Sequence, residues 1–143
     1  MAVTKTTIEY ADYPDFERED FVLRVPAGIR SKADLLLVLA NAGHFPDYFG
    51  CNWDALQDCL RDLSWIDNRK VVVVHSDVPL RESPAECRTY LEIVQTVLAD
   101  WTESVKPDVA APPPDWPYVA HELRVVFPLE AKAVVAHLLG GSD

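Results

Sequence analysis

Apolar residues occur along the chain in short blocks, and three of these blocks have the pattern of β-strands. Residues 21–25 alternate weakly between apolar and polar and are followed by a proline and a glycine, which end strands. Residues 71–74 are four consecutive valines, a β-branched run typical of a strand buried on both faces of a parallel sheet. Residues 123–127 alternate again. The pattern predicts three strands.

Four further blocks have helical spacing, at residues 33–42, 52–63, 85–103 and 131–138. Ser31 precedes the first block and Asp34 lies within it, and together they resemble a capping box with a shorter acid in place of Glu. Gly43 suits the position just after that helix. Asn52 is a good N-cap for the second helix, which spans roughly 18 Å. In the third helix we expect these side chains to face inward: Cys87, Leu91, Val94, Val97, Leu98 and Trp101.

The order of these blocks is strand, helix, helix, strand, helix, strand, helix. Helices between strands act as crossovers, so the order predicts an α/β fold with a small parallel sheet. With 143 residues, one domain over residues 21–143 is expected, preceded by an extension at residues 1–20 of uncertain structure. Residues 107–120 are proline-rich, and we interpret them as an insertion loop.

The chain is acidic, and its charge limits the class of partner. There are 23 Asp and Glu residues against 13 Lys and Arg, for a net charge of −10. This balance argues against nucleic acid and anionic membranes, and it favours a basic protein partner. No apolar run approaches the roughly 20 residues of a membrane span, and the first residues lack the apolar core of a secretion signal. Three cysteines, an odd number, suggest reduced thiols without a disulfide, as in the cytoplasm.

The most informative stretch is residues 45–63, a loop followed by the second helix. We expect Gly50 to allow a sharp turn in the loop, and four helical residues form an apolar stripe: Trp53, Leu56, Leu60 and Leu63. On another face, Asp54, Asp58 and Asp62 stand one helical turn apart, and such like charges weaken an isolated helix. One interpretation is a solvated surface, with Asp54 favoured by the helix dipole. The other is a functional acidic face.

Enzymatic interpretations are weaker. Cys51, just before a helix, and His44 form a conceivable nucleophilic pair, but nearby aspartates oppose a thiolate. Asp54 and Asp58 meet the spacing of an acid–base carboxylate pair only loosely. The other histidines, His75, His121 and His137, show no metal-ligand spacing with the cysteines, and all four are expected to be ordinary loop or helix residues. We therefore expect no enzyme, no metal and no cofactor.

The acidic stretch resembles a known motif, L-P-E-Y-Y-G-x-N-x-D-A-L-x-D-C-L, of the barstar family of ribonuclease inhibitors. The matching positions are Pro46, Tyr48, Gly50, Asn52, Asp54, Ala55, Leu56, Asp58, Cys59 and Leu60. The resemblance covers about residues 21–104 and returns weakly at residues 121–127. It implies a barstar-like single layer, a three-stranded parallel sheet covered by helices, to which this chain adds a C-terminal helix.

The resemblance also implies a partner-binding surface. Its residues are Tyr48, Phe49, Gly50, Asn52, Asp54, Gln57 and Asp58. In this family Asp58 matches the carboxylate that takes the place of a substrate phosphate, and Asp54 matches a second interface aspartate. Tyr48 matches a tyrosine that lies against the catalytic histidine of the enzyme, and Asn52 an asparagine that hydrogen-bonds the partner.

The chain departs from the family at the interface. Gln57 stands where the family has an interface tryptophan, and Cys51 where it has a charged residue. A glutamate late in the family's last helix matches either Asp100 or Glu103, and the sequence leaves that choice open.

The function implied is inhibition of a microbial guanyl-type ribonuclease, whose active site the loop and helix would block. We expect a one-to-one complex with a basic, extracellular-type ribonuclease, a monomer when free, and a cytoplasmic location. The alternative is a barstar-like adaptor or immunity module that binds a basic protein other than a ribonuclease.

Overall fold

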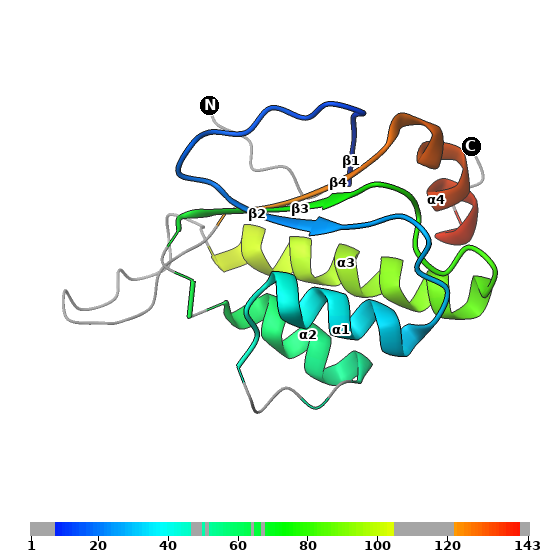
Figure 1. The fold of residues 1–143 in the computed structure, drawn as a ribbon, viewed down its shortest axis with the longest axis horizontal. Coiled ribbons are helices and arrows are strands. Elements are labelled where there is room, and N and C mark those ends of the chain that lie inside the picture. The colour runs from blue at the N-terminus through cyan, green and yellow to red at the C-terminus, as the bar shows by residue number, and fades with distance from the viewer. Residues whose placement is uncertain are drawn as a thin grey trace.

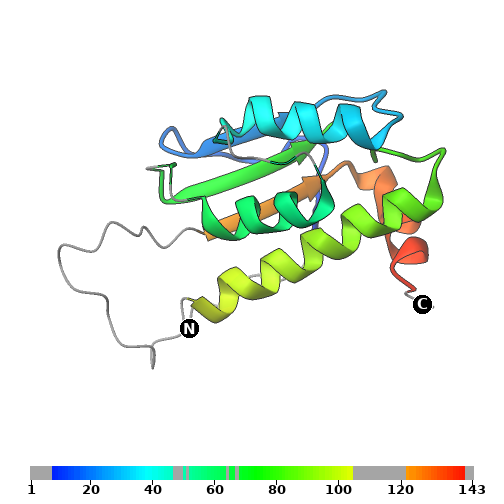
Figure 2. The ribbon, with the colours of Figure 1, turned by 90° about the horizontal axis from the view of Figure 1, so that it is seen from below.

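The computed structural model describes residues 8–46, 50, 52–63, 65–66, 68–104 and 122–140, with only the backbone of residues 102–104. The elements are β1 (Glu9–Tyr10), β2 (Phe21–Val25), α1 (Lys32–Ala42), α2 (Trp53–Asp62), β3 (Lys70–His75), α3 (Pro84–Ser104), β4 (Glu122–Phe127), a 3-10 turn η1 (Leu129–Ala131) and α4 (Lys132–Leu138). Helices α1, α2 and α3 lie on one face of the sheet (Figures 1 and 2). The α/β class and each predicted strand and helix are confirmed.

The sheet has the order β1-β4-β3-β2, and every neighbouring pair is parallel. In β2 and β3, Phe21 is aligned with Val71 and Val25 with His75. Parallel neighbours need crossover connections, which α1 with α2 and then α3 supply. The predicted parallel pairing of these two strands is confirmed.

Within the described residues the sheet has four strands, so the expected count of three is wrong. The added strand β1 pairs with β4, aligning Glu9 with Val126. Two residues are too few to show an alternating pattern in the sequence. The strand is instead held by a residue far away in the sequence, because Glu9 accepts two 2.9 Å hydrogen bonds from the Arg124 guanidinium. The segment between β1 and β2 then crosses the sheet on the face away from the helices (Figure 1).

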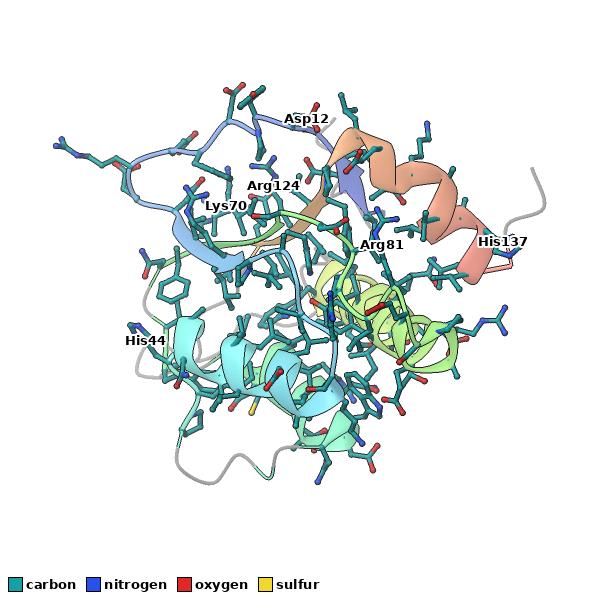
Figure 3. All side chains as sticks on the ribbon, turned by 45° about the vertical axis from the view of Figure 1, so that its right-hand side comes forward. Asp12, His44, Lys70, Arg81, Arg124 and His137 are labelled. Atoms are coloured by element: carbon teal, nitrogen blue, oxygen red, sulfur yellow. The ribbon has the colours of Figure 1, made fainter. Side chains whose placement is uncertain are left out.

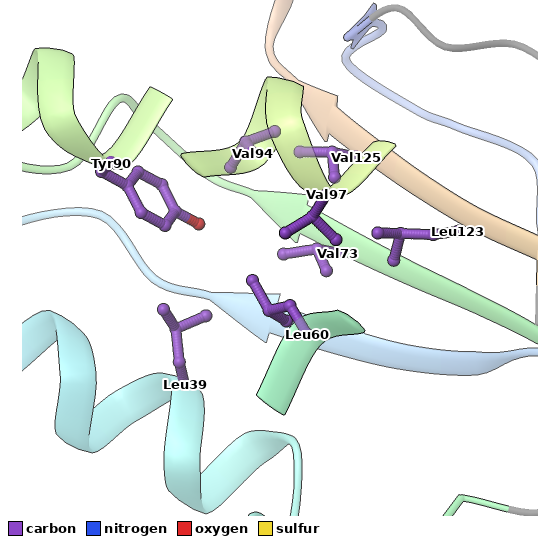
Figure 4. A pocket seen from close by; sticks show the side chains of 8 residues that line it. All are labelled: Leu39, Leu60, Val73, Tyr90, Val94, Val97, Leu123 and Val125. Carbon is purple, nitrogen blue, oxygen red and sulfur yellow. The ribbon is translucent and has the colours of Figure 1, made fainter. Parts of the chain in front are cut away.

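The core lies between the sheet and the three helices. Val71, Val72 and Val73 are at most 3% exposed, which confirms a strand buried on both faces. The predicted inward side chains of α3 are all buried. A cavity of about 10 Å³ remains among core side chains that include Leu39, Leu60 and Val97 (Figure 4). A cavity with room for no more than about one water molecule indicates close packing.

Gly43 ends α1 for a reason other than the expected one. Its φ is −92°, outside the left-handed region, and His44 takes a φ of 54° instead. A Cβ at Gly43 would lie 2.7 Å from Cε1 of Phe45 and 2.9 Å from the carbonyl oxygen of Leu39. Close packing therefore excludes a side chain here. The predicted N-cap is confirmed, because Oγ of Ser31 accepts from a backbone N–H of the first turn at 3.1 Å.

The C-terminal helix docks against the start of α3. Nε of Arg88 donates to the Leu138 carbonyl oxygen at 2.6 Å, which satisfies a backbone acceptor at the end of α4. The apolar side chain of Val135 is buried against the core. The predicted additional helix is thus part of the same packed unit.

Candidate partner-binding face

Helix α2 begins as the sequence predicts. Asn52 is extended (φ −139°, ψ 172°), and its Oδ1 accepts from the Ala55 N–H at 2.7 Å. This hydrogen bond satisfies a donor of the first turn. Gly50 is not in the left-handed region, so the expected turn does not require glycine; a Cβ there would instead lie 3.3 Å from Nδ2 of Asn52.

The apolar stripe of α2 faces the core, as predicted. Leu56 and Leu63 are fully buried, Leu60 is 5% exposed, and Trp53 is half-buried. Leu63 ends the helix in the left-handed conformation (φ 50°), and its N–H donates to the Cys59 carbonyl oxygen at 3.0 Å. The stripe fixes which side of the helix faces outward.

Two carboxylates on the outward side have no partner within the described residues. Asp54 and Asp58 are exposed, and neither makes a hydrogen bond or ion pair there. They stand one turn apart, a rise of about 6 Å along the helix. Gln57 is half-buried beside them, and so is Asp62 at the helix end. The structure therefore brings three of the expected site side chains, those of Asp54, Gln57 and Asp58, onto one helix.

The N-terminal end of α2 is held from two sides. Nζ of Lys32, in α1, lies 5.4 Å from the centre of the Trp53 ring, a cation–π arrangement. The ring of Tyr90, in α3, lies 6.4 Å from that of Trp53. Trp53 thereby links the start of α2 to both neighbouring helices.

The C-terminal end of α2 is held by α3. Nε1 of Trp101 donates to the Leu60 carbonyl oxygen at 2.8 Å, which satisfies one of the last acceptors of the helix. Nε of Arg61 lies 2.9 Å from Oδ2 of Asp100. The sequence carries no signal for either contact, because the residues lie far apart in the chain. Of the two late-helix acids, Asp100 pairs with α2, whereas the Glu103 side chain lies outside the described residues.

His75 is the last residue of β3 and is 3% exposed, so its expected place in a loop or helix is wrong. Nδ1 lies 3.0 Å from the Val126 carbonyl oxygen and must carry the hydrogen, because a carbonyl only accepts. Nε2 therefore accepts from the Tyr90 hydroxyl at 2.7 Å. Burial lowers the pKa of His75 to about 4, although the Val126 contact raises it. Burial also raises the pKa of Tyr90. With both nitrogens occupied, His75 is structural.

The described cysteines are inert thiols. Cys59 and Cys87 are free and buried, so no disulfide joins them. Burial, followed by the charges of Asp62 and Asp58, raises the pKa of Cys59. Burial raises the pKa of Cys87 to about 11. Tyr48, Phe49 and Cys51 lie outside the described residues. His44, the other half of the conceived nucleophilic pair, is exposed, and its ring lies nearly perpendicular to that of Phe21, with the centroids 5.6 Å apart.

The opposite face of the sheet carries a groove of about 640 Å³ beneath residues 11–16. Arg124 and Lys70 lie on this outer face, away from α1 (Figure 3). Of the residues that line it, Asp12 serves the fold, because its Oδ1 accepts from the Leu129 N–H at 3.0 Å. His75 also lines the groove, but its side chain is bonded to Tyr90 of α3 on the helix-covered face, so its ring is not available to act as an acid or base in the groove.

Across the described ranges, no three His, Cys, Asp or Glu side chains gather as a metal site would require. No helix in those ranges combines the length and apolar character needed to span a membrane.

The comparisons with known proteins identify a family. A family model described as "Barstar (barnase inhibitor)" matches residues 21–110, more than half of the 143-residue chain. The match begins at β2 and includes α1, α2 and α3, hence every residue of the expected binding surface. No curated protein and no solved structure matches the chain.

Proposed function

The chain belongs to the barstar family, whose members are inhibitors rather than enzymes, and from this premise we propose that it inhibits a basic microbial ribonuclease. One observation supports the proposal most strongly. Asp54 and Asp58 are exposed, without partners in the described structure, and lie on a helix held at both ends.

The chemistry suits a ribonuclease active site. Such a site binds an anionic phosphodiester and therefore concentrates cationic side chains. A carboxylate presented by a rigid helix can occupy the phosphate position and accept the same charge-assisted hydrogen bonds. Because α2 is already ordered by its contacts with Lys32 and Trp101, binding would cost little conformational entropy.

The proposed surface comprises the seven residues that the family resemblance implies, from Tyr48 to Asp58. Asp58 would take the phosphate position and Asp54 would pair with a second cation of the enzyme. The Asn52 side chain already caps α2 through Oδ1, and its Nδ2 donates one hydrogen to the Gly50 carbonyl oxygen at 3.4 Å, so the second amide hydrogen is the donor left for a partner. Free Cys59 and Cys87 accord with the proposed cytoplasmic location, where thiols stay reduced.

One observation favours the alternative partner. Gln57 is half-buried beside the two aspartates, at the position where the family presents a tryptophan. Aromatic side chains dominate many interfaces, so this surface lacks one anchor. A barstar-like adaptor or immunity module for a basic protein that is not a nuclease would use the same carboxylates.

The test is a titration of RNA hydrolysis by barnase, as a basic guanyl-specific ribonuclease, with increasing amounts of this protein. We expect activity to fall linearly to zero at one equivalent, consistent with a one-to-one complex of a free monomer. Asp54→Asn combined with Asp58→Asn should abolish the inhibition, whereas Glu130→Gln, an exposed acid of η1, should not. Full activity at excess wild-type protein would contradict inhibition of this enzyme, and capture of a basic non-nuclease would favour the adaptor.

A further inference from the structure

Arg61 is a cation among the carboxylates of α2. In an α-helix, residues three and four apart are neighbours on the surface, so Arg61 adjoins both Asp58 and Gln57. From this spacing alone, the guanidinium could pair with Asp58 and neutralise it. It would also repel the cations of a basic partner. The direction taken by this side chain therefore decides the charge of the face.

The structure directs Arg61 to the neighbouring helix. Helices α2 and α3 lie side by side (Figure 2), and Nε of Arg61 is 2.9 Å from Oδ2 of Asp100. That oxygen is buried and receives no hydrogen bond of good angle from the described residues, so the charge of the guanidinium is what balances it there. The adjacent Trp101 N–H bonds the Leu60 carbonyl oxygen and fixes the two helices at this point.

We propose that Asp100 is a positioning residue that holds Arg61 against α3 and thereby keeps Asp58 free for a cationic partner. This inference rests on the proposed function of the face. Without Asp100, Arg61 would be released toward its helical neighbour Asp58. The face would then present a carboxylate already paired and a mobile cation, and a basic protein would associate more slowly.

The first experiment needs no partner. The Nε–H signal of Arg61 in NMR should show an ordered side chain in the wild-type protein and a mobile one in Asp100→Asn. The matched control is Asp77→Asn, because Asp77 pairs with Arg81 at 2.9 Å and precedes α3 at its other end. The control should mobilise Arg81 and leave Arg61 ordered. An Arg61 signal that is equally ordered in Asp100→Asn would overturn the inference.

The second experiment measures association with barnase by stopped flow at low ionic strength. Asp100→Asn should slow association roughly 3- to 10-fold, and Asp77→Asn less than about 2-fold, although each removes one negative charge. Adding Arg61→Ala to Asp100→Asn should restore the wild-type rate, since the released cation is then absent.

Equal slowing by Asp100→Asn and Asp77→Asn would mean that only net charge matters, and a failure of Arg61→Ala to restore the rate would exclude the release of Arg61. Both outcomes would overturn the inference. If wild-type protein fails to bind barnase, the proposed function loses its support. The NMR experiment still decides whether Asp100 positions Arg61.

Discussion

Carboxylates on two surfaces of this protein differ in whether they are paired. On the outer face of the sheet, Glu9 accepts two hydrogen bonds from Arg124, and the two side chains are only 17% and 21% exposed. On the outer face of α2, Asp54 and Asp58 are exposed and have no partner in the described structure.

The difference shows which charges serve the fold and which remain available. The Glu9–Arg124 pair joins β1 to β4 and contributes to stability because it is bidentate and partly withdrawn from water. The two aspartates contribute no such contact, and their mutual repulsion costs the helix a little stability. Substitutions on the two faces should therefore have opposite consequences for binding and for folding.

The largest effect is expected at Asp58. If it takes the phosphate position of a ribonuclease, Asp58→Ala leaves cations of the enzyme buried and unpaired, which costs about 2–5 kcal/mol of binding free energy, mostly through faster dissociation. The free energy of unfolding should change by no more than about 0.5 kcal/mol. Dissociation kinetics with barnase and thermal unfolding measure the two quantities. A large loss of stability would show that Asp58 is structural.

A second effect is expected in the interior, where buried His75 should make stability depend on pH. Because the pKa of His75 is about 4 in the folded protein against its ordinary 6.5, the unfolded chain binds the extra proton between these values. The His75 contribution to the free energy of unfolding should be fully present above pH 6.5 and be lost as the pH drops toward 4. The loss should be about 3 kcal/mol, at about 1.36 kcal/mol per pKa unit. Urea unfolding across this range measures the loss.

Two variants test the assignment of that pH dependence to His75. In His75→Gln the titrating group is absent, so the His75 contribution to the slope should disappear. In Tyr90→Phe the hydroxyl no longer donates to Nε2, so protonation of the ring should become easier and the slope shallower. An unchanged slope in His75→Gln would assign the effect to other groups.

A smaller effect is expected on the outer face of the sheet. Arg124→Met keeps much of the side-chain volume but leaves the Glu9 carboxylate partly buried without its guanidinium, which should cost about 1–3 kcal/mol of stability. Adding Glu9→Gln should recover part of the loss. Binding of barnase should be unaffected at temperatures where the variant is folded. A binding loss equal to that of Asp58→Ala would remove the distinction between the two faces.

The smallest effect is expected at Asp62, in the same row but half-buried at the end of α2. Since charges at the rim of an interface usually contribute little, Asp62→Ala should weaken binding by less than about 1 kcal/mol. The dissociation rates of Asp62→Ala and Asp58→Ala, measured with barnase under the same conditions, compare the two losses. Equal losses for the two variants would indicate a diffuse acidic field rather than a specific phosphate-like contact.

Much of this architecture was predictable because it depends on local pattern. Four consecutive valines, residues 71–74, predicted a strand buried on both faces, and the order of strands and helices predicted parallel pairing. The helical spacing of Leu56 and Leu60 also determined that Asp54 and Asp58 would face away from the core. Each of these inferences depends only on residues close together in the chain or on the order of the elements.

Contacts between distant segments were not predictable in this way. Glu9 and Arg124 are 115 positions apart, and Trp101 and Leu60 are 41 apart, so no local periodicity links them. The same limit explains the errors at β1 and His75, since a two-residue strand and a lone histidine carry no pattern of their own.

The sequence by itself determined the parallel α/β fold and the acidic outer face of α2, because hydrophobic periodicity specifies which side of each element is buried. Only the tertiary structure decided that Arg61 pairs with Asp100 of α3 rather than with its helical neighbour Asp58. The reason is physical: both carboxylates are within reach of a long, flexible side chain, and the packing of α3 against α2 places one of them, partly buried, beside the guanidinium.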